Sequence, residues 1–230
     1  MKYSNIVKGK FIERPNRFIA HIEINGKTEV CHVKNTGRCR ELLIKGCNVY
    51  LEKSDNPNRK TKYDLIAVEK GNLLVNMDSN APNKVVQEWL TASGCPILQE
   101  RGQAFVKPEY KYKNSRFDFY VEDGARKIFI EVKGVTLENE GVVKFPDAPS
   151  ERAVKHVEEL IDALQEGYET YVIFVVQMKE VKYFTPNQDT HPEFCKALKK
   201  AEKSGVKILA YDCIVTEGTI KLNQQVAVRL

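Results

Sequence analysis

The sequence predicts an α+β protein in two parts, a strand-rich part over residues 1–80 and a mixed α/β part over residues 81–230. Three observations support this prediction. Up to residue 80, short apolar runs are separated by glycine turns. After residue 80, segments with helical spacing of apolar residues alternate with apolar strands. One of these strands, residues 171–176, is apolar without interruption, which is typical of a strand covered on both faces.

The first part consists of short candidate strands joined by tight turns. Asn25-Gly26 and Lys70-Gly71 each lie between two apolar runs, as in a β-hairpin. A short helix is expected over Arg38–Leu43, ending near Gly46. The candidate strands are Ile6–Glu13, Phe18–Ile24, Thr28–His32, Asn48–Glu52, Tyr63–Glu69 and Asn72–Asn76. Five or six short strands with one small helix indicate a compact β-barrel of the oligonucleotide-binding type.

The second part combines three predicted helices with buried strands. Pro82 opens the first helix, which stops at Gly94. Ser150 starts the second helix, whose apolar side leaves Arg152, His156 and Glu159 on the other side. Pro192 opens a third helix that ends at Gly205, and Lys207–Val215 is expected to be the final strand. This alternation predicts a mixed central sheet flanked by helices.

A β-hairpin is predicted over residues 115–132, with Asp123-Gly124 as its two-residue loop. In this register Asp118 lies opposite Phe129, so Asp118 and Glu131 are diagonal neighbours, about 7–8 Å apart at their Cα atoms. Alternation places both acids on one face of the hairpin. The opposite face is wholly apolar and is expected to be buried; it comprises Phe117, Phe119, Val121, Ile128, Ile130 and Val132.

Asp118, Glu131 and Lys133 form the candidate catalytic group. Carboxylate oxygens are the ligands that Mg²⁺ and Mn²⁺ prefer, so Asp118 and Glu131 are the predicted metal ligands. Lys133 projects on the same side as Glu131, where an ammonium can orient an attacking water or meet developing negative charge. The pattern favours metal-dependent phosphodiester chemistry, or nucleic-acid binding on the same frame. The structural alternative is a surface hairpin with ordinary charges.

Other polar residues are candidates for contact with a polyanion. Residues 32–38 lead from a predicted strand into the predicted short helix, where Lys34, Asn35 and Arg38 are suited to phosphate; a capped turn with solvated charges explains them equally well. In the second part the candidates to bind phosphate are Arg116 and Arg152. The sequence leaves open whether four further residues join the site: Asp147 as another acid near the metal, His156 as a phosphate contact, and Glu88 and Gln177, whose burial it does not decide.

The charge balance agrees with a polyanionic partner. The formal net charge is +5 and the calculated pI is about 8.7. The residues after Met1 lack the apolar core of a signal peptide, and no run approaches the length of a membrane span, which predicts a cytoplasmic protein. The six cysteines form no C-x-x-C pair and show no zinc-site spacing.

Together, the segments His32–Arg38, Ser115–Phe119, Glu131–Leu137 and Phe145–Pro149 resemble the sugar fermentation stimulation protein A family over nearly the entire chain. This resemblance implies DNA binding, an oligonucleotide-binding-like barrel and a domain similar to restriction-type nucleases. The nuclease pattern, Pro-Asp followed by Asp/Glu-x-Lys, maps onto Asp118, Glu131 and Lys133, with Phe117 in the place of the proline.

The sequence therefore predicts a DNA-binding protein that retains a nuclease-like centre, with possible Mg²⁺- or Mn²⁺-dependent phosphodiester hydrolysis. The alternative is a non-catalytic DNA-binding regulator of sugar metabolism that uses the same surface. An RNA-binding protein is a third possibility, because such barrels accept several single-stranded ligands. Base preference, strandedness and oligomeric state stay open.

Overall fold

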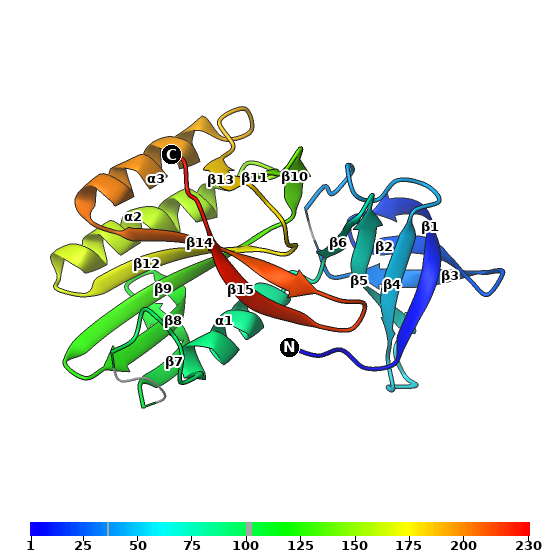
Figure 1. Ribbon diagram of the computed structural model, residues 1–230, viewed down its shortest axis with the longest axis horizontal. Helices are drawn as coiled ribbons and strands as arrows, with labels where there is room; N and C mark the ends of the chain where they lie inside the picture. The colour runs from blue at the N-terminus through cyan, green and yellow to red at the C-terminus, as the bar shows by residue number, and fades with distance from the viewer. Residues whose placement is uncertain (36, 100–102) are drawn as a thin grey trace.

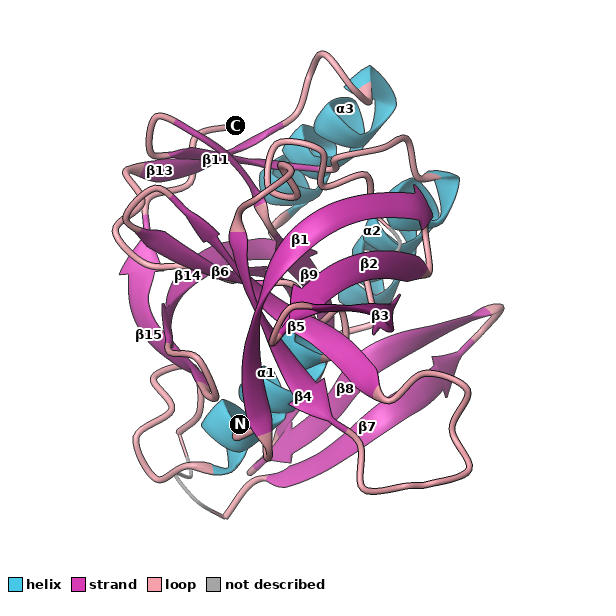
Figure 2. Cartoon of the chain, turned by 90° about the vertical axis from the view of Figure 1, so that its right-hand side faces the viewer, coloured by secondary structure: helices cyan, strands magenta, loops and turns pink. Residues whose placement is uncertain are grey.

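The computed structural model of the protein describes residues 1–35, 37–99 and 103–230. A β-barrel lies at one end of the molecule, and a larger sheet with three helices lies at the other (Figure 1). Viewed from the barrel end, the barrel strands stand in front of the larger sheet and its helices (Figure 2). The mixed α/β class predicted from the sequence is confirmed.

Five strands close the barrel. β1 pairs with β2 and β4, β2 with β3, and β4 with β5, and β3 runs parallel to β5 to complete the ring. β6 extends the sheet from β5. The strands are β1 Ile6–Asn16, β2 Ile19–Ile24, β3 Lys27–Val33, β4 Asn48–Lys53, β5 Tyr63–Lys70 and β6 Leu73–Asn76. The predicted oligonucleotide-binding-type barrel is therefore present, because Ile22, Val49 and Leu65 are fully buried inside a closed ring.

The predicted helix over Arg38–Leu43 is wrong, because this segment forms a turn. Cys39 has φ +45°, in the left-handed region, and a right-handed helix does not continue through such a residue. The amides of Leu42 and Leu43 both donate to the carbonyl of Cys39, at 3.3 and 3.0 Å, and close a single turn. Thr36, which precedes this segment, lies outside the described residues.

The second sheet has the order β15–β14–β12–β9–β8–β7. Its centre is parallel, because β12 pairs in parallel with both β9 and β14, and its outer pairs are antiparallel. The strands are β7 Phe105–Tyr112, β8 Ser115–Asp123, β9 Arg126–Val135, β12 Glu169–Val176, β14 Lys207–Val215 and β15 Ile220–Val226. Residues 171–176 are buried throughout, as their unbroken apolar run predicts.

Three helices cover the two faces of this sheet: α1 Ala81–Thr91, α2 Glu151–Gln165 and α3 Pro192–Ser204. α1 lies on one face, and α2 and α3 lie together on the other (Figure 1). The predicted start of α2 at Ser150 is confirmed, and the Ser150 hydroxyl caps the helix by accepting a hydrogen bond from the amide of Ala153. α3 ends at Gly205 with φ +105°, also as predicted. None of the described helices has both the length and the apolar composition to span a membrane.

Two features of the second part were not predicted. Lys207–Val215 is not the final strand, because the chain turns back and β15 pairs antiparallel with it. A small additional sheet, in the order β10–β11–β13, lies above the carboxyl end of β9, and its strands are β10 Leu137–Asn139, β11 Val142–Phe145 and β13 Tyr183–Pro186. These strands are three or four residues long, which is too short for the alternation of apolar and polar residues that predicts a strand to be recognised in the sequence.

The β8–β9 hairpin is present, but its predicted loop is wrong. Asp123 pairs with Arg126, so the loop is Gly124-Ala125. Gly124 has φ +63°, and a glycine with positive φ at the first loop position is typical of a type II′ turn. Asp123 is buried instead of lying in the loop, and its carboxylate binds the Arg126 guanidinium at 2.6 Å.

This change moves the hairpin register by two residues. Phe129 lies opposite Tyr120 rather than Asp118, and extending the ladder by one pair puts Asp118 level with Glu131 instead of on its diagonal. The predicted apolar face is also partly wrong. The Phe117 ring packs against that of Phe129, with 5.0 Å between centroids, on the side covered by α2.

Candidate functional site

The pairing of β8 is interrupted at Asp118. The β8–β9 ladder ends at Phe119, and on the other side Glu109 of β7 has φ +56° and leaves the ladder. Without pairing, strand alternation does not set the direction of the Asp118 side chain. Its Oδ2 accepts from the amide of Val132 at 2.7 Å, and its Oδ1 accepts from Nδ2 of Asn83 at 2.8 Å. The carboxylate therefore lies against the backbone of β9, beside the start of α1.

Glu131 points toward α2, where its Oε1 accepts from Nζ of Lys133 and pairs with Nδ1 of His156, each at 2.6 Å. Nε of Arg152 donates to Nε2 of His156 at 3.3 Å. Since arginine is only a donor, Nε2 must accept, and Nδ1–H is then the donor to Glu131. Although His156 lies on the side of the helix predicted to be away from its apolar residues, it is buried, with an exposed fraction of 4%.

The two acids differ in protonation. Burial raises the pKa of Asp118 to about 6, and the negative charge of Glu131 acts in the same direction. Burial also acts to raise the pKa of Glu131, but Lys133 and His156 outweigh it and hold this pKa below its ordinary value. Two coupled carboxylates with pKa values moved in opposite directions are common at functional sites.

One oxygen of this pair is available to a cation. Glu131 Oε2 is buried and has no hydrogen-bond partner among the described residues. Leaving such an atom without a partner costs free energy, which a bound cation would recover. No group of three or more His, Cys, Asp or Glu suited to a metal occurs within the described ranges. Asp118 and Glu131 supply the oxygen donors that a hard cation prefers, and a cation bound there would complete its coordination with water and phosphate, as Mg²⁺ commonly does.

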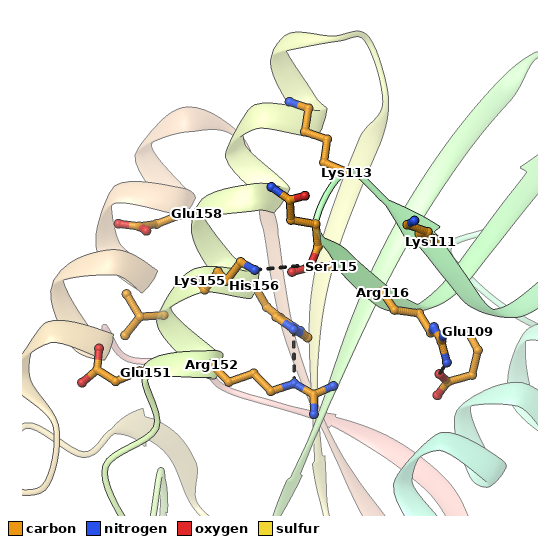
Figure 3. A pocket seen from close by; sticks show the side chains of 12 residues that line it. Glu109, Lys111, Lys113, Ser115, Arg116, Glu151, Arg152, Lys155, His156 and Glu158 are labelled. Carbon is orange, nitrogen blue, oxygen red and sulfur yellow. Dashed lines mark hydrogen bonds and ion pairs between the residues drawn. The ribbon is translucent and has the colours of Figure 1, made fainter.

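A groove of about 850 Å³ lies between the β7–β8 hairpin and helix α2. Figure 3 shows basic side chains reaching it from both elements. His156 forms part of its wall, so the groove meets Glu131 through this histidine. The basic side chains that line it are Lys111, Lys113, Arg116, Arg152 and Lys155, and the acidic ones are Glu109, Glu151 and Glu158.

The two predicted phosphate contacts of the second part, Arg116 and Arg152, thus lie in one groove. Both side chains are exposed. Arg116 forms a 3.3 Å ion pair with Glu109, and Arg152 bonds only Nε2 of His156 among the interactions of the described residues. An exposed ion pair such as the one between Arg116 and Glu109 is weak, so a phosphate can readily replace Glu109 as the partner of Arg116.

The predicted contacts of the first part lie in different surroundings. The Lys34 ammonium lies 3.2 Å from Asp64 and 3.7 Å from both Glu52 and Asp78, so three carboxylates already neutralise it. Asn35 is occupied by the local turn, where its Oδ1 accepts from the amide of Gly37. Arg38 is exposed, and its backbone amide donates to Asp147 at 2.9 Å. Only Arg38 of these three presents an unpaired polar side chain within the described ranges.

Of the four residues left open by the sequence, only His156 contacts the acidic pair among the described interactions, and the other three have their contacts elsewhere. Glu88 binds the ammonium group of Met1 at 2.5 Å. Asp147 and Gln177 line a cavity of about 170 Å³ between the barrel and the second sheet. Gln177 bonds Asn76 of the barrel at 2.9 Å, and a Cβ on Gly134 would lie 2.7 Å from its Oε1, so glycine is required there for close approach.

Two groups of residues were not found from the sequence. Asn83 carries no signal beyond its place in the first turn of α1, yet it binds Asp118. Arg14, Arg17 and Arg40 converge with Arg38 on the barrel, and their spacing in the sequence, with two arginines on each side of β2–β3, was the available sign.

We expect His156 to hold Glu131 in position. Replacement by Phe removes the hydrogen bond, and we expect the affinity for Mg²⁺, measured by calorimetry, to fall about 10- to 100-fold, as it does when outer partners of metal ligands are removed from other sites. Asn keeps a donor near the place of Nδ1, so His156→Asn should recover much of the affinity. Equal affinities for wild type and His156→Phe would show that the histidine only packs.

Comparisons with known proteins agree with this architecture. Residues 80–219 match the family described as the sugar fermentation stimulation protein RE domain, and residues 12–77 match the SfsA N-terminal OB domain. A sugar fermentation stimulation protein homolog from Ruminiclostridium cellulolyticum is 61% identical over 235 residues, and one from Clostridium beijerinckii is 61% identical over 230 residues. Each of these alignments covers 100% of both chains.

A solved structure is also similar over the full chain. It is described as the structure of Pyrococcus furiosus SfsA in complex with Ca²⁺, and it matches with a TM-score of 0.89 and 27% sequence identity, covering 100% of this chain and 98% of the other. With both family matches and full-length relatives at this identity, the chain belongs to the sugar fermentation stimulation protein family.

Proposed function

We propose that this protein binds DNA and hydrolyses phosphodiester bonds with a divalent cation, Mg²⁺ or Mn²⁺, held by Asp118 and Glu131. The observation that carries the proposal is the buried, unpartnered Oε2 of Glu131 beside an aspartate whose pKa is raised. The relative from Pyrococcus furiosus is described as a Ca²⁺ complex, and Ca²⁺ shares with Mg²⁺ a preference for oxygen ligands.

The side chains around the acidic pair have distinct parts in this proposal. When bound, the cation lowers the pKa of a water and stabilises charge on the attacked phosphate. Asn83 and the amide of Val132 hold the Asp118 carboxylate in place. Lys133, 2.6 Å from Glu131, is placed to orient water or to meet the developing charge. Arg116 and Arg152 are placed to bind substrate phosphate in the adjoining groove.

A non-catalytic DNA-binding regulator is the second candidate, and one observation favours it. The Lys133 ammonium already neutralises Glu131, so the carboxylate has a positive partner without a metal. In such a protein the basic groove and the barrel contact DNA, and the acidic pair has a structural role.

Metal removal separates the two candidates. Purified protein is incubated with labelled single- and double-stranded DNA in Mg²⁺, in Mn²⁺, or in an excess of chelator. We expect products with either metal and none with chelator, and we expect the activity to return when the metal is restored. DNA that is bound but left intact under every condition would contradict hydrolysis and support the regulator.

A further inference from the structure

The barrel carries a basic pocket separate from the groove beside α2. Its volume is about 270 Å³, and it lies between the β1–β2 connection and the segment that follows β3. None of the described residues that line it carries a carboxylate; the lining side chains that matter here are Arg14, Arg17, Arg38 and Arg40. We call this the arginine pocket.

Arg14 builds the pocket. Its two terminal nitrogens donate to four backbone carbonyls, those of Arg17 at 2.7 Å, Asn35 at 2.6 Å, Gly37 at 2.9 Å and Arg38 at 3.0 Å. These bonds fasten the β1–β2 connection to the segment after β3. These carbonyls satisfy the two terminal nitrogens but carry no charge, and the buried Nε has no hydrogen-bond partner among the described residues. The guanidinium therefore leaves a positive charge under the pocket that no described acid neutralises.

The other three arginines are available to a ligand. Arg17, Arg38 and Arg40 are exposed, and none has an ion pair among the described residues. The Arg17 guanidinium lies 4.6 Å from the centre of the exposed Phe18 ring. The chain has 26 lysines and ten arginines, yet the pocket contains four arginines and no lysine. The planar guanidinium binds phosphate through two parallel hydrogen bonds, which lysine cannot do.

The arginine pocket leads toward β9, which carries Glu131, by way of the cavity between the barrel and the second sheet. Gly37 lines both the arginine pocket and the cavity between barrel and sheet. On the far side of that cavity lies Gly134, which follows Lys133 in β9. The backbone amide of Arg38 also donates a hydrogen bond to the Asp147 carboxylate. This bond fixes the arginine pocket to the second part of the protein.

We propose that the arginine pocket binds a backbone phosphate of the same nucleic-acid strand that is presented to Asp118 and Glu131. The inference rests on the proposed function and deepens it, because it names the substrate class: a strand long enough to lie across the junction and occupy both sites. Shorter strands reach only one site and bind weakly.

The test compares the double variant Arg17→Gln/Arg40→Gln with Arg229→Gln, a matched loss of an exposed arginine in the second part. Fluorescence anisotropy in Ca²⁺ measures binding of oligothymidylates of about 4 and about 30 nucleotides, the range that spans one barrel site and more. We expect the double variant to bind the long strand about tenfold more weakly and the short strand unchanged. Its salt slope should fall by about 0.7 for each phosphate that the variant no longer neutralises.

Two outcomes overturn the proposal: an unchanged affinity and salt slope for the long strand, or equal weakening for both lengths. Duplex DNA and the matching RNA strands, measured in the same way, identify which strand type shows the length dependence. Hydrolysis of bis(4-nitrophenyl) phosphate, which is too small to reach the pocket, separates the two ideas. If the wild type does not hydrolyse bis(4-nitrophenyl) phosphate, the proposed catalytic function fails. The dependence of binding on strand length would still show whether the arginine pocket binds a backbone phosphate.

Discussion

Glu131→Gln is expected to abolish metal-dependent cleavage while DNA binding is kept or becomes tighter. The substitution keeps the size of the side chain but removes the charge that a cation requires, so we expect the cleavage rate to fall by more than about 100-fold, beyond the loss typical of an outer partner. Binding does not need this charge, and removing a negative group beside the groove reduces repulsion of phosphate. Cleavage and binding of one labelled strand are measured in parallel.

The effect of Glu131→Gln can also be measured without an activity assay, through the pKa of Asp118. In the wild type the charge of Glu131 helps to raise the pKa of Asp118, so this pKa should fall in Glu131→Gln. The aspartate resonance followed by NMR titration would report the change. Glu122→Gln, an exposed glutamate on the same hairpin, is the matched control and should cleave normally. If wild type and Glu131→Gln cleave at equal rates, the acidic pair is not the catalytic centre.

Local patterns in the sequence were sufficient to predict most of the fold. The strands of the barrel, the start of α2 at Ser150 and the end of α3 at Gly205 depend on residues within a few positions of each other, and they were predicted closely. The hairpin register failed because Asp123-Gly124 and Gly124-Ala125 are both acceptable loops. The burial of Asp123 against Arg126 decides between them, and the turn residues alone do not show that contact.

The candidate site was predicted in part for a related reason. Asp118, Glu131 and Lys133 are near in sequence, and the structure brings Lys133 to Glu131 as a neighbour in the same strand. The contacts that set their properties come from elsewhere, with Asn83 from α1 and His156 from α2. Whether a lysine is available to DNA is likewise a tertiary property. Lys34 is suited to phosphate by its sequence position, but the fold places Asp64 and Asp78 beside it.

Stabilisation of the protein by a divalent cation is expected to depend strongly on pH, with Asp118 as the responsible group. Its pKa is about 6 in the folded protein, against an ordinary value of 3.8. Between these values the folded state binds more protons than the unfolded state. The contribution of this carboxyl to the free energy of unfolding therefore decreases as the pH rises from about 4 to about 6. Above pH 6 the charge on the half-buried Asp118 lowers the free energy of unfolding, and a bound cation would offset this loss.

Below pH 6 a cation must displace the Asp118 proton, so its apparent affinity should fall about tenfold for each pH unit. Glu131 has a lowered pKa and stays ionised across this window, so it does not contribute to the slope. Calorimetric titration with Ca²⁺ between about pH 5 and 7.5, with the rise in melting temperature as a second measure, tests this expectation. In Asp118→Asn the affinity should be weak and nearly independent of pH. An equal rise in melting temperature at both ends of the range in the wild type would mean that the cation binds elsewhere, because a carboxylate that must lose a proton to bind cannot be indifferent to pH.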